Sequence, residues 1–199
     1  MAQKPIEDMK QLIRERIRDL QTVQNLFVET QAQDLIGLAL DIAQAFSQGK
    51  KIMIMGNGGS AADAQHMAAE FVNRFKIERA PLPALSLSTD TSILTAIGND
   101  YGFDQVFEKQ IQALGVSGDI LLGISTSGNS PNIIRGFKTA REKKITTVAL
   151  TGNRGGSMIE WADRSLIVPS SDTPHIQETH ILAIHLLCEL VDSSLFPNH

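Results

Sequence analysis

The chain has 199 residues, 42% of them hydrophobic, and a formal net charge of −4. This length and apolar content suit one globular domain, and we treat residues 1–199 as a single domain. The acidic balance, without a basic stripe, argues against nucleic-acid binding. The only cysteine, Cys188, excludes a disulfide framework and a cysteine-based zinc site, and we expect it to be an inert core residue. The N-terminus lacks a signal-peptide core, and no apolar run reaches the ~20 residues of a membrane span, so we expect a cytoplasmic protein without membrane contact.

The first part of the chain is predicted to be helical. Over residues 5–28, apolar side chains such as Met9, Ile13 and Ile17 recur every three or four positions. A second helical segment, residues 31–48, stops at Gly49. These N-terminal helices, residues 5–48, either pack on the domain or build an oligomer.

The stretch from Lys51 to Glu70 predicts a strand, a glycine turn and a helix. An apolar run over residues 52–55 indicates a short buried strand, Gly56-Asn57-Gly58-Gly59 follows, and helix-forming residues begin after Ser60. Ser60 with Asp63 three residues later resembles a capping box. Glycines admit close approach of a ligand, and the N–H groups of the first helical turn face it. We therefore predict an anion-binding turn here.

Two further features of this stretch have alternative interpretations. The spacing Gly56-x-Gly58-x-x-Ala61 also fits a dinucleotide fingerprint, but Asp90 lies 29 residues after Ala61, too far for the usual spacing of ~20. His66 and Glu70, four residues apart, lie on one helix face, about 40° apart. Such a pair is often a surface hydrogen bond, yet its neighbours Ala62, Met67, Ala68 and Ala69 indicate a largely apolar setting.

Four more strands are predicted, over residues 82–88, 119–125, 146–151 and 165–168. Helices are expected over residues 104–114, 131–143 and 176–195, and the cluster from Gly98 to Gly102 is typical of a loop. Strands that alternate with helices imply a parallel sheet covered on both faces, in which ligands bind beyond the carboxyl ends of the strands.

A second anion-binding loop follows the strand 119–125. Its hydroxyl groups come from Ser125, Thr126, Ser127 and Ser130, and Ser130 before Pro131 is typical of a helix N-cap. Dense Ser and Thr also occur in plain turns. Two such loops in one domain nevertheless favour a phosphorylated ligand.

Within the closing helix, Gln177 and His185 lie about 80° apart around the axis, whereas His180 and His185 lie about 140° apart. Only one of the two histidines can therefore share a site with Gln177. A lone histidine in an apolar helix is usually a core residue, which is our expectation for His180.

These motifs together resemble the sugar isomerase (SIS) family. The resemblance rests on GNGGSAADAQH at 56–66, GNDYGF at 98–103, LLGISTSGNS at 121–130, VALTG at 148–152 and the pattern IQETHxxAIHxLCxLxD across 176–192, and it covers nearly the whole chain. It implies a flavodoxin-like three-layer α/β sandwich with a five-stranded parallel sheet, assembled as a homotetramer with active sites between subunits. It also implies interconversion of sedoheptulose 7-phosphate and D-glycero-D-manno-heptose 7-phosphate, the first step toward nucleotide-activated heptose for bacterial surface glycans.

The resemblance assigns roles to individual residues. Glu70 is implied to be the catalytic base and His185 its acid–base counterpart. The implied substrate-binding residues are Asn57, Gly58, Gly59, Glu70, Asn99, Asp100, Ser125, Thr126, Ser127, Ser130 and Gln177. Some members bind zinc, here implied at His66, Glu70, Gln177 and His185 with one ion per subunit and no nucleotide cofactor. Pro174-His175 replaces an Asp-Arg pair of some members, which leaves the contacts of the 170–175 loop open.

The chemistry agrees with the residue types. An aldose–ketose interconversion moves a proton between C1 and C2 through an enediol, and it needs a carboxylate base and an acid at the sugar oxygens. The main alternative is a tetrameric adaptor that binds the bacterial replication initiator, a relative implied to lack the base and the final histidine that this chain has. A sugar-phosphate-sensing module without turnover and a nucleotide-dependent oxidoreductase are further alternatives.

Overall fold

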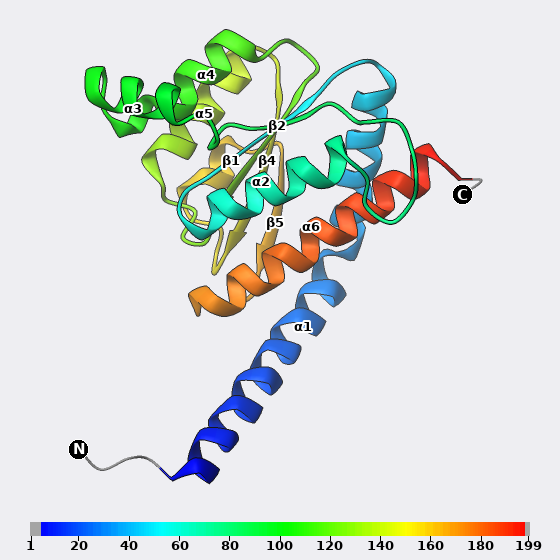
Figure 1. Ribbon diagram of the computed structural model, residues 1–199, viewed down its shortest axis with the longest axis vertical. Coiled ribbons are helices and arrows are strands. Elements are labelled where there is room, and N and C mark those ends of the chain that lie inside the picture. The colour runs from blue at the N-terminus through cyan, green and yellow to red at the C-terminus, as the bar shows by residue number, and fades with distance from the viewer. Residues whose placement is uncertain (1–4, 198–199) are drawn as a thin grey trace.

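Five parallel strands form the sheet of the computed structural model, which describes residues 5–197 (Figure 1). The strands are β1 (Ile52–Gly56), β2 (Ala84–Ser86), β3 (Ile120–Ser125), β4 (Thr146–Gly152) and β5 (Arg164–Val168), in the order β2-β1-β3-β4-β5. β1, β3 and most of β4 are buried, as their near-continuous apolar runs predict. The predicted five-stranded parallel sheet is confirmed, although β2 is shorter than the predicted strand over residues 82–88.

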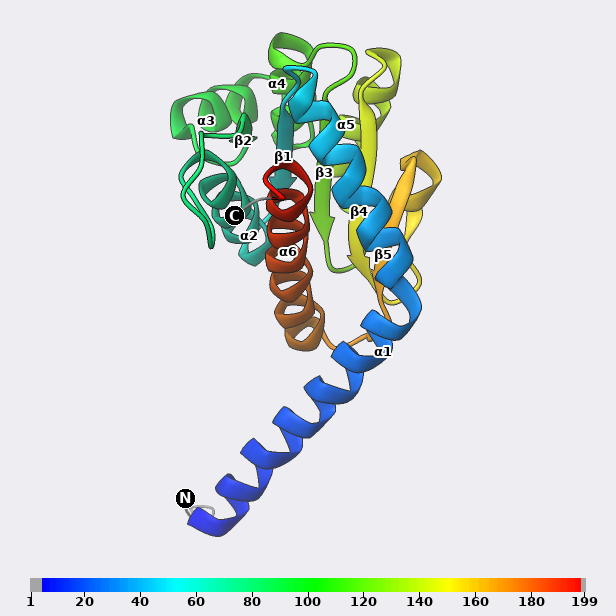
Figure 2. The same cartoon turned by 90° about the vertical axis from the view of Figure 1, so that its right-hand side faces the viewer.

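Helices cover both faces of this sheet. The helices are α1 (Ile6–Ser47), α2 (Gly59–Val72), α3 (Thr91–Asp100), α4 (Val106–Leu114), α5 (Pro131–Glu142) and α6 (Thr173–Leu195), with short 3₁₀ turns η1 (Phe103–Gln105) and η2 (Ser157–Trp161). Figure 2 shows α1, α2 and α6 on one side of the sheet, with α4 and α5 on the other. The predicted three-layer sandwich is therefore confirmed.

Alternating side chains of each strand supply two separate cores. Successive side chains of a strand point to opposite faces. In β1, Ile52 and Ile54 join the core under α1, α2 and α6, whereas Met53 and Met55 join the core under α4 and α5. Because the sheet separates the two cores, predicted site residues on helices of opposite faces lie apart within one chain.

Helix α1 is one continuous helix, whereas the sequence suggested two. Its second half packs on α6 and β5 with buried Phe27, Leu38 and Ile42, and the Gln31 side chain accepts a hydrogen bond from the Ile167 N–H of the edge strand. Its first half extends away from the sheet (Figures 1 and 2). Exposed apolar side chains lie along that half: Ile6, Met9, Leu12, Ile13 and Ile17. None of the helices within residues 5–197 is long and apolar enough to cross a membrane.

Two local predictions are wrong. The capping box at Ser60 does not form, because α2 already begins at Gly59 and its N-cap is Gly58, whose positive φ of 57° suits a residue without a side chain. The Gly98–Gly102 cluster is not wholly a loop either. Helix α3, capped by Asp90 through the Ile93 N–H at 2.9 Å, continues to Asp100. The cap of α2 therefore depends on backbone geometry that residue type alone did not reveal.

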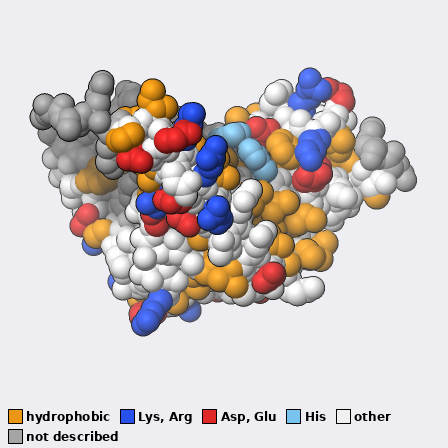
Figure 3. All heavy atoms as spheres, turned by 90° about the horizontal axis from the view of Figure 1, so that it is seen from below, with side chains coloured by type: hydrophobic (Ala, Val, Ile, Leu, Met, Phe, Trp, Pro, Cys, Tyr) orange, Lys and Arg blue, Asp and Glu red, His pale blue; other side chains and the backbone are white. Residues whose placement is uncertain are grey.

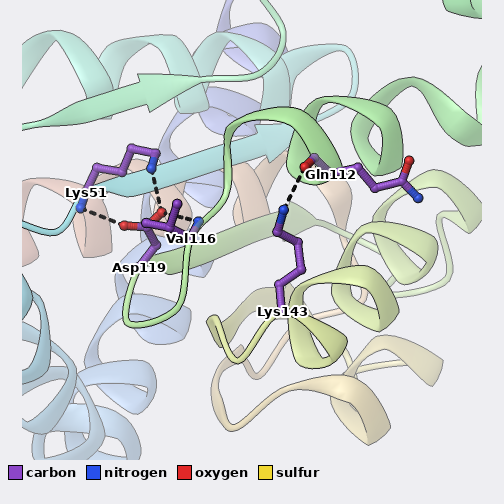
Figure 4. Close-up of polar contacts among 5 residues, drawn as sticks. All are labelled: Lys51, Gln112, Val116, Asp119 and Lys143. Atoms are coloured by element: carbon purple, nitrogen blue, oxygen red, sulfur yellow. Dashed lines mark hydrogen bonds and ion pairs between the residues drawn. The ribbon is translucent and has the colours of Figure 1, made fainter.

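The amino end of the sheet is held by a buried carboxylate (Figure 4). Asp119 is fully buried just before β3. It accepts hydrogen bonds from the Lys51 N–H at 3.1 Å and the Val116 N–H at 2.9 Å, and it pairs with the Lys51 ammonium at 2.6 Å. Nearby, Lys143 donates to the Gln112 carbonyl at 2.6 Å. These bonds tie the starts of β1 and β3 to the loop after α4.

Candidate active site

Three of the predicted functional side chains meet between α2 and α6. The Nε2 atom of His66 lies 3.0 Å from Oε1 of Glu70 on the same helix and 3.5 Å from Nε2 of His185 on α6. The two imidazoles make an edge-to-face contact with centroids 5.1 Å apart. The sequence prediction that α2 and α6 bring Glu70 and His185 to one place therefore agrees with the geometry.

This group is open to solvent in the single chain. The side chains of His66 and Glu70 are 43% and 22% exposed. The largely apolar setting expected from their neighbours is wrong, because Met67 and Ala68 point into the core instead. Figure 3 shows histidine side chains in a hollow of the molecular surface, with acidic and basic side chains around it. A ligand or a second subunit could therefore reach this group directly.

Gln177 lies two helical turns from this group, beside the first glycine turn. A side chain added at Gly59 would approach the Gln177 amide nitrogen to 2.6 Å, so that the Gln177 amide closely covers the start of α2. Eight residues of α6 separate Gln177 from His185, a rise of about 12 Å. Within one chain, Gln177 therefore lies at the glycine turn, apart from the other three predicted zinc ligands, and His185 lies farther along α6.

The hydroxyl-rich loop after β3 forms a compact turn at the carboxyl end of the sheet. The Ser125 and Ser130 hydroxyls lie 3.0 Å apart, and the Ser125 oxygen accepts the Gly128 N–H at 3.2 Å. Gly128 packs so tightly against the loop after β4 that an added Cβ would lie 1.9 Å from the Gly155 carbonyl oxygen. Ser127 stays exposed, and Ser130 is the N-cap residue of α5 without a side-chain capping bond. The loop therefore offers hydroxyls to an anion at the start of α5.

An amide pair that the sequence analysis missed links the two anion-binding loops. The Asn57 Nδ2 donates to Asn132 Oδ1 at 3.0 Å, and the Asn132 Nδ2 donates back to Asn57 Oδ1 at 2.9 Å. Asn132 is buried in the first turn of α5, and its Oδ1 also accepts the Ile133 N–H. Two sequence-distant asparagines carry no local signal of pairing. Their reciprocal bonds fix the first loop against the second.

Asn99 and Asp100 lie apart from the other predicted site residues. Both are exposed at the end of α3, where Asn99 donates to Asp100 at 2.8 Å. Helix α3 packs against α4 and η1, on the opposite side of the sheet from α6. Within one chain, these two residues therefore do not join Glu70 and His185.

The donor atoms at the α2–α6 group suit a zinc ion in part. Two ligands of a tetrahedral zinc with bonds of 2.0–2.1 Å lie about 3.3 Å from one another. The 3.0 and 3.5 Å separations around His66 are close to that value. No set of three His, Cys, Asp or Glu side chains within residues 5–197 already encloses a metal position. The residue types fit zinc, but within one chain these side chains do not surround a single metal position.

Burial changes the titration of three groups outside this cluster. His180 is fully buried without a hydrogen-bond partner at either ring nitrogen, and burial lowers its pKa to about 4. It is a core histidine, as expected. Burial also raises the pKa of the Cys188 thiol to about 12, which confirms an inert core cysteine. Burial raises the pKa of Asp63, and the nearby His66 opposes that shift.

The first turn of α6 contains the departure from some family members. Pro174 stands in the first turn of α6, where its missing N–H costs no helical bond. His175 is buried there, and its carbonyl accepts the Thr179 hydroxyl at 2.8 Å. His175 therefore supports the start of α6, next to Gln177.

The family profile described as SIS domain matches residues 17–152 of this chain. The chain is 55% identical over 192 residues to a phosphoheptose isomerase from Nitratidesulfovibrio vulgaris, covering 96% of this chain and 92% of the relative. It is 53% identical to a phosphoheptose isomerase from Aquifex aeolicus, with 94% and 96% of the two chains covered.

Solved structures give the same result. The structure of phosphoheptose isomerase from Neisseria gonorrhoeae matches with a TM-score of 0.88 at 43% identity, covering 93% of this chain and 99% of the other. A phosphoheptose isomerase structure from Francisella tularensis matches with a TM-score of 0.90 at 36% identity, covering 93% and 98%. The fold and most of the chain length are therefore shared with these isomerases.

Proposed function

The chain belongs to the SIS domain family, and we propose that it is a phosphoheptose isomerase. The proposed reaction interconverts sedoheptulose 7-phosphate and D-glycero-D-manno-heptose 7-phosphate, the first step of nucleotide-activated heptose synthesis. The observation that carries the proposal is the meeting of Glu70 and His185 beside His66, in a chain more than half identical to proteins of that name over nearly its whole length. A cytoplasmic location belongs to the same proposal, since a charged sugar phosphate does not cross a bilayer unaided.

Glu70 supplies the base of this reaction. Its carboxylate removes the proton from C1 of the ketose, which gives an enediol, and returns a proton to C2 to form the aldose. His185 moves the accompanying proton between the oxygens on C1 and C2. Each group ends the cycle in its starting protonation state, so no external acid, base or oxidant is consumed.

The hydroxyl loop binds the phosphate at the other end of the sugar. Ser125, Thr126, Ser127 and Ser130 surround the start of α5, where N–H groups and the helix dipole favour an anion. Asn57, Gly58 and Gly59 adjoin that loop through the Asn57–Asn132 pair and hold the sugar hydroxyls. Gln177, beside Gly59, contacts the same part of the substrate.

A homotetramer completes the active site in this proposal. Asn99 and Asp100 lie on the opposite side of the sheet from Glu70, so that a second copy is needed for them to line the same sugar. The exposed apolar stripe on the first half of α1 gives such copies a surface to pack on. A chain that begins at Gln31 should lose the tetramer in light scattering. A well-behaved tetramer of that shortened chain would place the assembly elsewhere.

Zinc is a further part of the proposal. His66, Glu70 and His185 would hold it, and because one α6 does not bring Gln177 to them, Gln177 would join from a neighbouring subunit. When bound, zinc would polarise the oxygens of the sugar as a Lewis acid. Elemental analysis of protein purified without chelator should give about one zinc per chain, and His66→Ala should lower it. Metal-free protein with full activity would rule out an obligatory role.

The adaptor alternative is less well supported. The relatives described above are isomerases by name, and this chain has the carboxylate and the final histidine that the isomerisation requires. A sensing module without turnover makes the same contacts but no product. Binding of the substrate and its conversion therefore together separate the enzyme from both alternatives.

The direct test is incubation of the purified protein with sedoheptulose 7-phosphate and detection of the heptose by NMR. The proposal predicts conversion to an equilibrium mixture of ketose and aldose. Binding of the ketose without conversion would favour the sensing module. Neither binding nor conversion would favour the adaptor.

A further inference from the structure

The segment between α2 and β2, residues 73–83, is fastened to α6 at three points. Phe75 stacks on His185 with ring centroids 5.5 Å apart at 21°, and the Lys76 ammonium pairs with Glu189 at 2.7 Å. Arg79 pairs with Asp192 at 2.6 Å. Phe75 therefore touches the catalytic His185 side chain directly, and Arg79 also contacts the backbone of Glu70.

Arg79 is a buried cap on the end of α2. Its side chain is 0% exposed, and that of its partner Asp192 is 5% exposed. The guanidinium donates to the Glu70 carbonyl at 3.0 Å, the Phe71 carbonyl at 2.8 Å and the Ala80 carbonyl at 3.2 Å, while its Nε donates to Asp192. The last carbonyls of a helix have no partner within the helix. Arg79 therefore satisfies the carbonyl of the proposed base itself.

Asp192 extends this contact to the helix that carries the other catalytic residue. It lies seven residues after His185 on α6, about 20° away around the axis and about 10 Å along it. The guanidinium joins the backbone at Glu70 to the same face of α6 that presents His185. The end of α2 therefore cannot move along α6 without breaking bonds at Arg79.

Stability alone does not account for this pair. A buried ion pair offsets much of its own attraction by the cost of removing two charges from water, so apolar residues of similar size often serve as well. An apolar pair, however, makes no directional hydrogen bonds that would fix the relative position of the two helices. Arginine has five donors in a fixed planar fork, which here meets one carboxylate and three carbonyls at once.

We propose that Arg79, Asp192 and Phe75 are positioning residues that set the placement of Glu70 relative to His185. Arg79 holds the backbone of Glu70 against α6. The phenyl ring of Phe75 stacks on the imidazole of His185 and holds it in place. The inference rests on the isomerase function proposed above, because it assigns these residues to the same proton transfer. None of the three touches the substrate in this assignment.

Two conservative substitutions test the Arg79 contact. Arg79→Lys keeps the charge opposite Asp192 but cannot reach the carboxylate and the carbonyls together, and Asp192→Asn keeps an acceptor but removes the charge. Circular dichroism and thermal unfolding identify which variants fold. In each folded variant, kcat should fall by about tenfold to 10²-fold because the reacting groups are misplaced. The KM should stay close to that of the wild type, since the phosphate loop is untouched.

Phe75→Leu tests the other contact with a readout that does not need activity. Leucine keeps an apolar side chain on His185 but has no aromatic ring, so the His185 ring proton signals should move downfield in NMR spectra while kcat falls. Glu189→Gln is the matched control. It breaks the exposed Lys76–Glu189 pair on the same segment and should leave both kcat and the His185 signals unchanged.

The outcomes separate this inference from the proposed function. A wild-type protein that does not convert sedoheptulose 7-phosphate refutes the function, whereas wild-type conversion with full kcat in folded Arg79→Lys or Asp192→Asn overturns the positioning role. If neither of those variants folds, Phe75→Leu decides. Reduced kcat with displaced His185 signals supports the role, and wild-type kcat overturns it.

Discussion

The two ends of the sheet satisfy their buried polar groups to different degrees. At the amino end, both carboxylate oxygens of Asp119 have partners, and Asp163 accepts bonds from the Thr147 N–H and hydroxyl at 2.8 and 2.9 Å. At the carboxyl end and on the helices that start there, buried atoms lack partners within residues 5–197. These atoms are Asp63 Oδ2, Thr151 Oγ1 and both ring nitrogens of His180. Asp192 Oδ2, near the last turn of α6 beside Arg79, also lacks a partner within this range.

This difference indicates that the amino end of the sheet stabilises the fold, whereas the carboxyl end carries the catalytic site. Buried polar groups are normally paired, and each unpaired one lowers stability. The hydrogen bonds of Asp119 and Asp163 fix the strand starts at the amino end, which bears none of the predicted site residues. The end with unpaired atoms bears both anion-binding loops, and the helices that start there carry Glu70 and His185. Changes at the two ends should therefore act on different quantities, stability at one and turnover at the other.

The largest expected effect is on turnover. His185→Ala should lower kcat by the ~10²–10⁴ typical of a lost acid–base group, with the fold kept because the side chain is only partly buried. Combining it with Glu70→Gln should reduce kcat scarcely further, since both residues act on one proton transfer. Steady-state kinetics of the three variants give the comparison. Multiplicative losses in the double variant would contradict a shared step.

The amino end should show the opposite behaviour. Asp119→Ala leaves the Lys51 and Val116 N–H groups without their acceptor and should lower the free energy of unfolding by about 2–5 kcal/mol in urea titrations. The kcat of the folded fraction should be unchanged. Asp104→Ala, at an exposed aspartate, is the control and should change stability by less than about 0.5 kcal/mol. A large loss of kcat in folded Asp119→Ala would break the division between the two ends.

His180 gives the carboxyl end a distinctive pH dependence. Its pKa of about 4 in the folded protein lies below the usual 6.5, so the unfolded chain takes up a proton that the folded chain resists. The free energy of unfolding should fall as the pH drops from 6.5 to 4, by on the order of 3 kcal/mol.

His180→Leu should remove this part of the pH dependence. Because neither ring nitrogen makes a hydrogen bond of normal geometry, the apolar replacement should leave stability at pH 7.5 nearly unchanged. Urea titrations of both proteins at several pH values measure the slope. An identical slope in the variant would show that other groups cause it.

The smallest effect is expected at the phosphate loop. Ser127→Ala with Ser130→Ala removes two hydroxyl donors, each worth about 0.5–1.5 kcal/mol or more toward a charged acceptor. Substrate affinity should therefore fall by roughly tenfold with the fold kept. An unchanged KM in the folded double variant would remove these hydroxyls from the phosphate site.

The fold was more predictable than the contacts that shape the site. The strands were identified because β1, β3 and β4 are buried on both faces and read as apolar runs, and the helices predicted between most of the strands implied parallel order. The cap at Gly58 and the length of α3 were missed, since they depend on backbone angles and packing. The same holds for the continuous α1, where no residue marked an interruption but the apolar pattern suggested a break near Glu29.

Contacts between distant residues were beyond the sequence argument. Asn57 pairs with Asn132, and Arg79 with Asp192, across 75 and 113 residues of chain. A lone arginine or asparagine in a sequence has no marker of a buried partner. The helix spacing of Gln177 and His185, about 80° around the axis, allowed both to share one site. The single chain instead places Gln177 beside Gly59, about 12 Å along α6 from His185.

Solvent exchange tests the assignment of Glu70 most directly. In deuterated water, the wild-type protein should incorporate deuterium at C2 of the aldose and C1 of the ketose, as NMR detects, because the base exchanges its proton with solvent. Glu70→Gln keeps the size and hydrogen-bonding capacity of the side chain but cannot take the proton. We expect it to bind the substrate and to show exchange reduced by at least 10²-fold. Exchange at the wild-type rate in this variant would show that Glu70 is not the base.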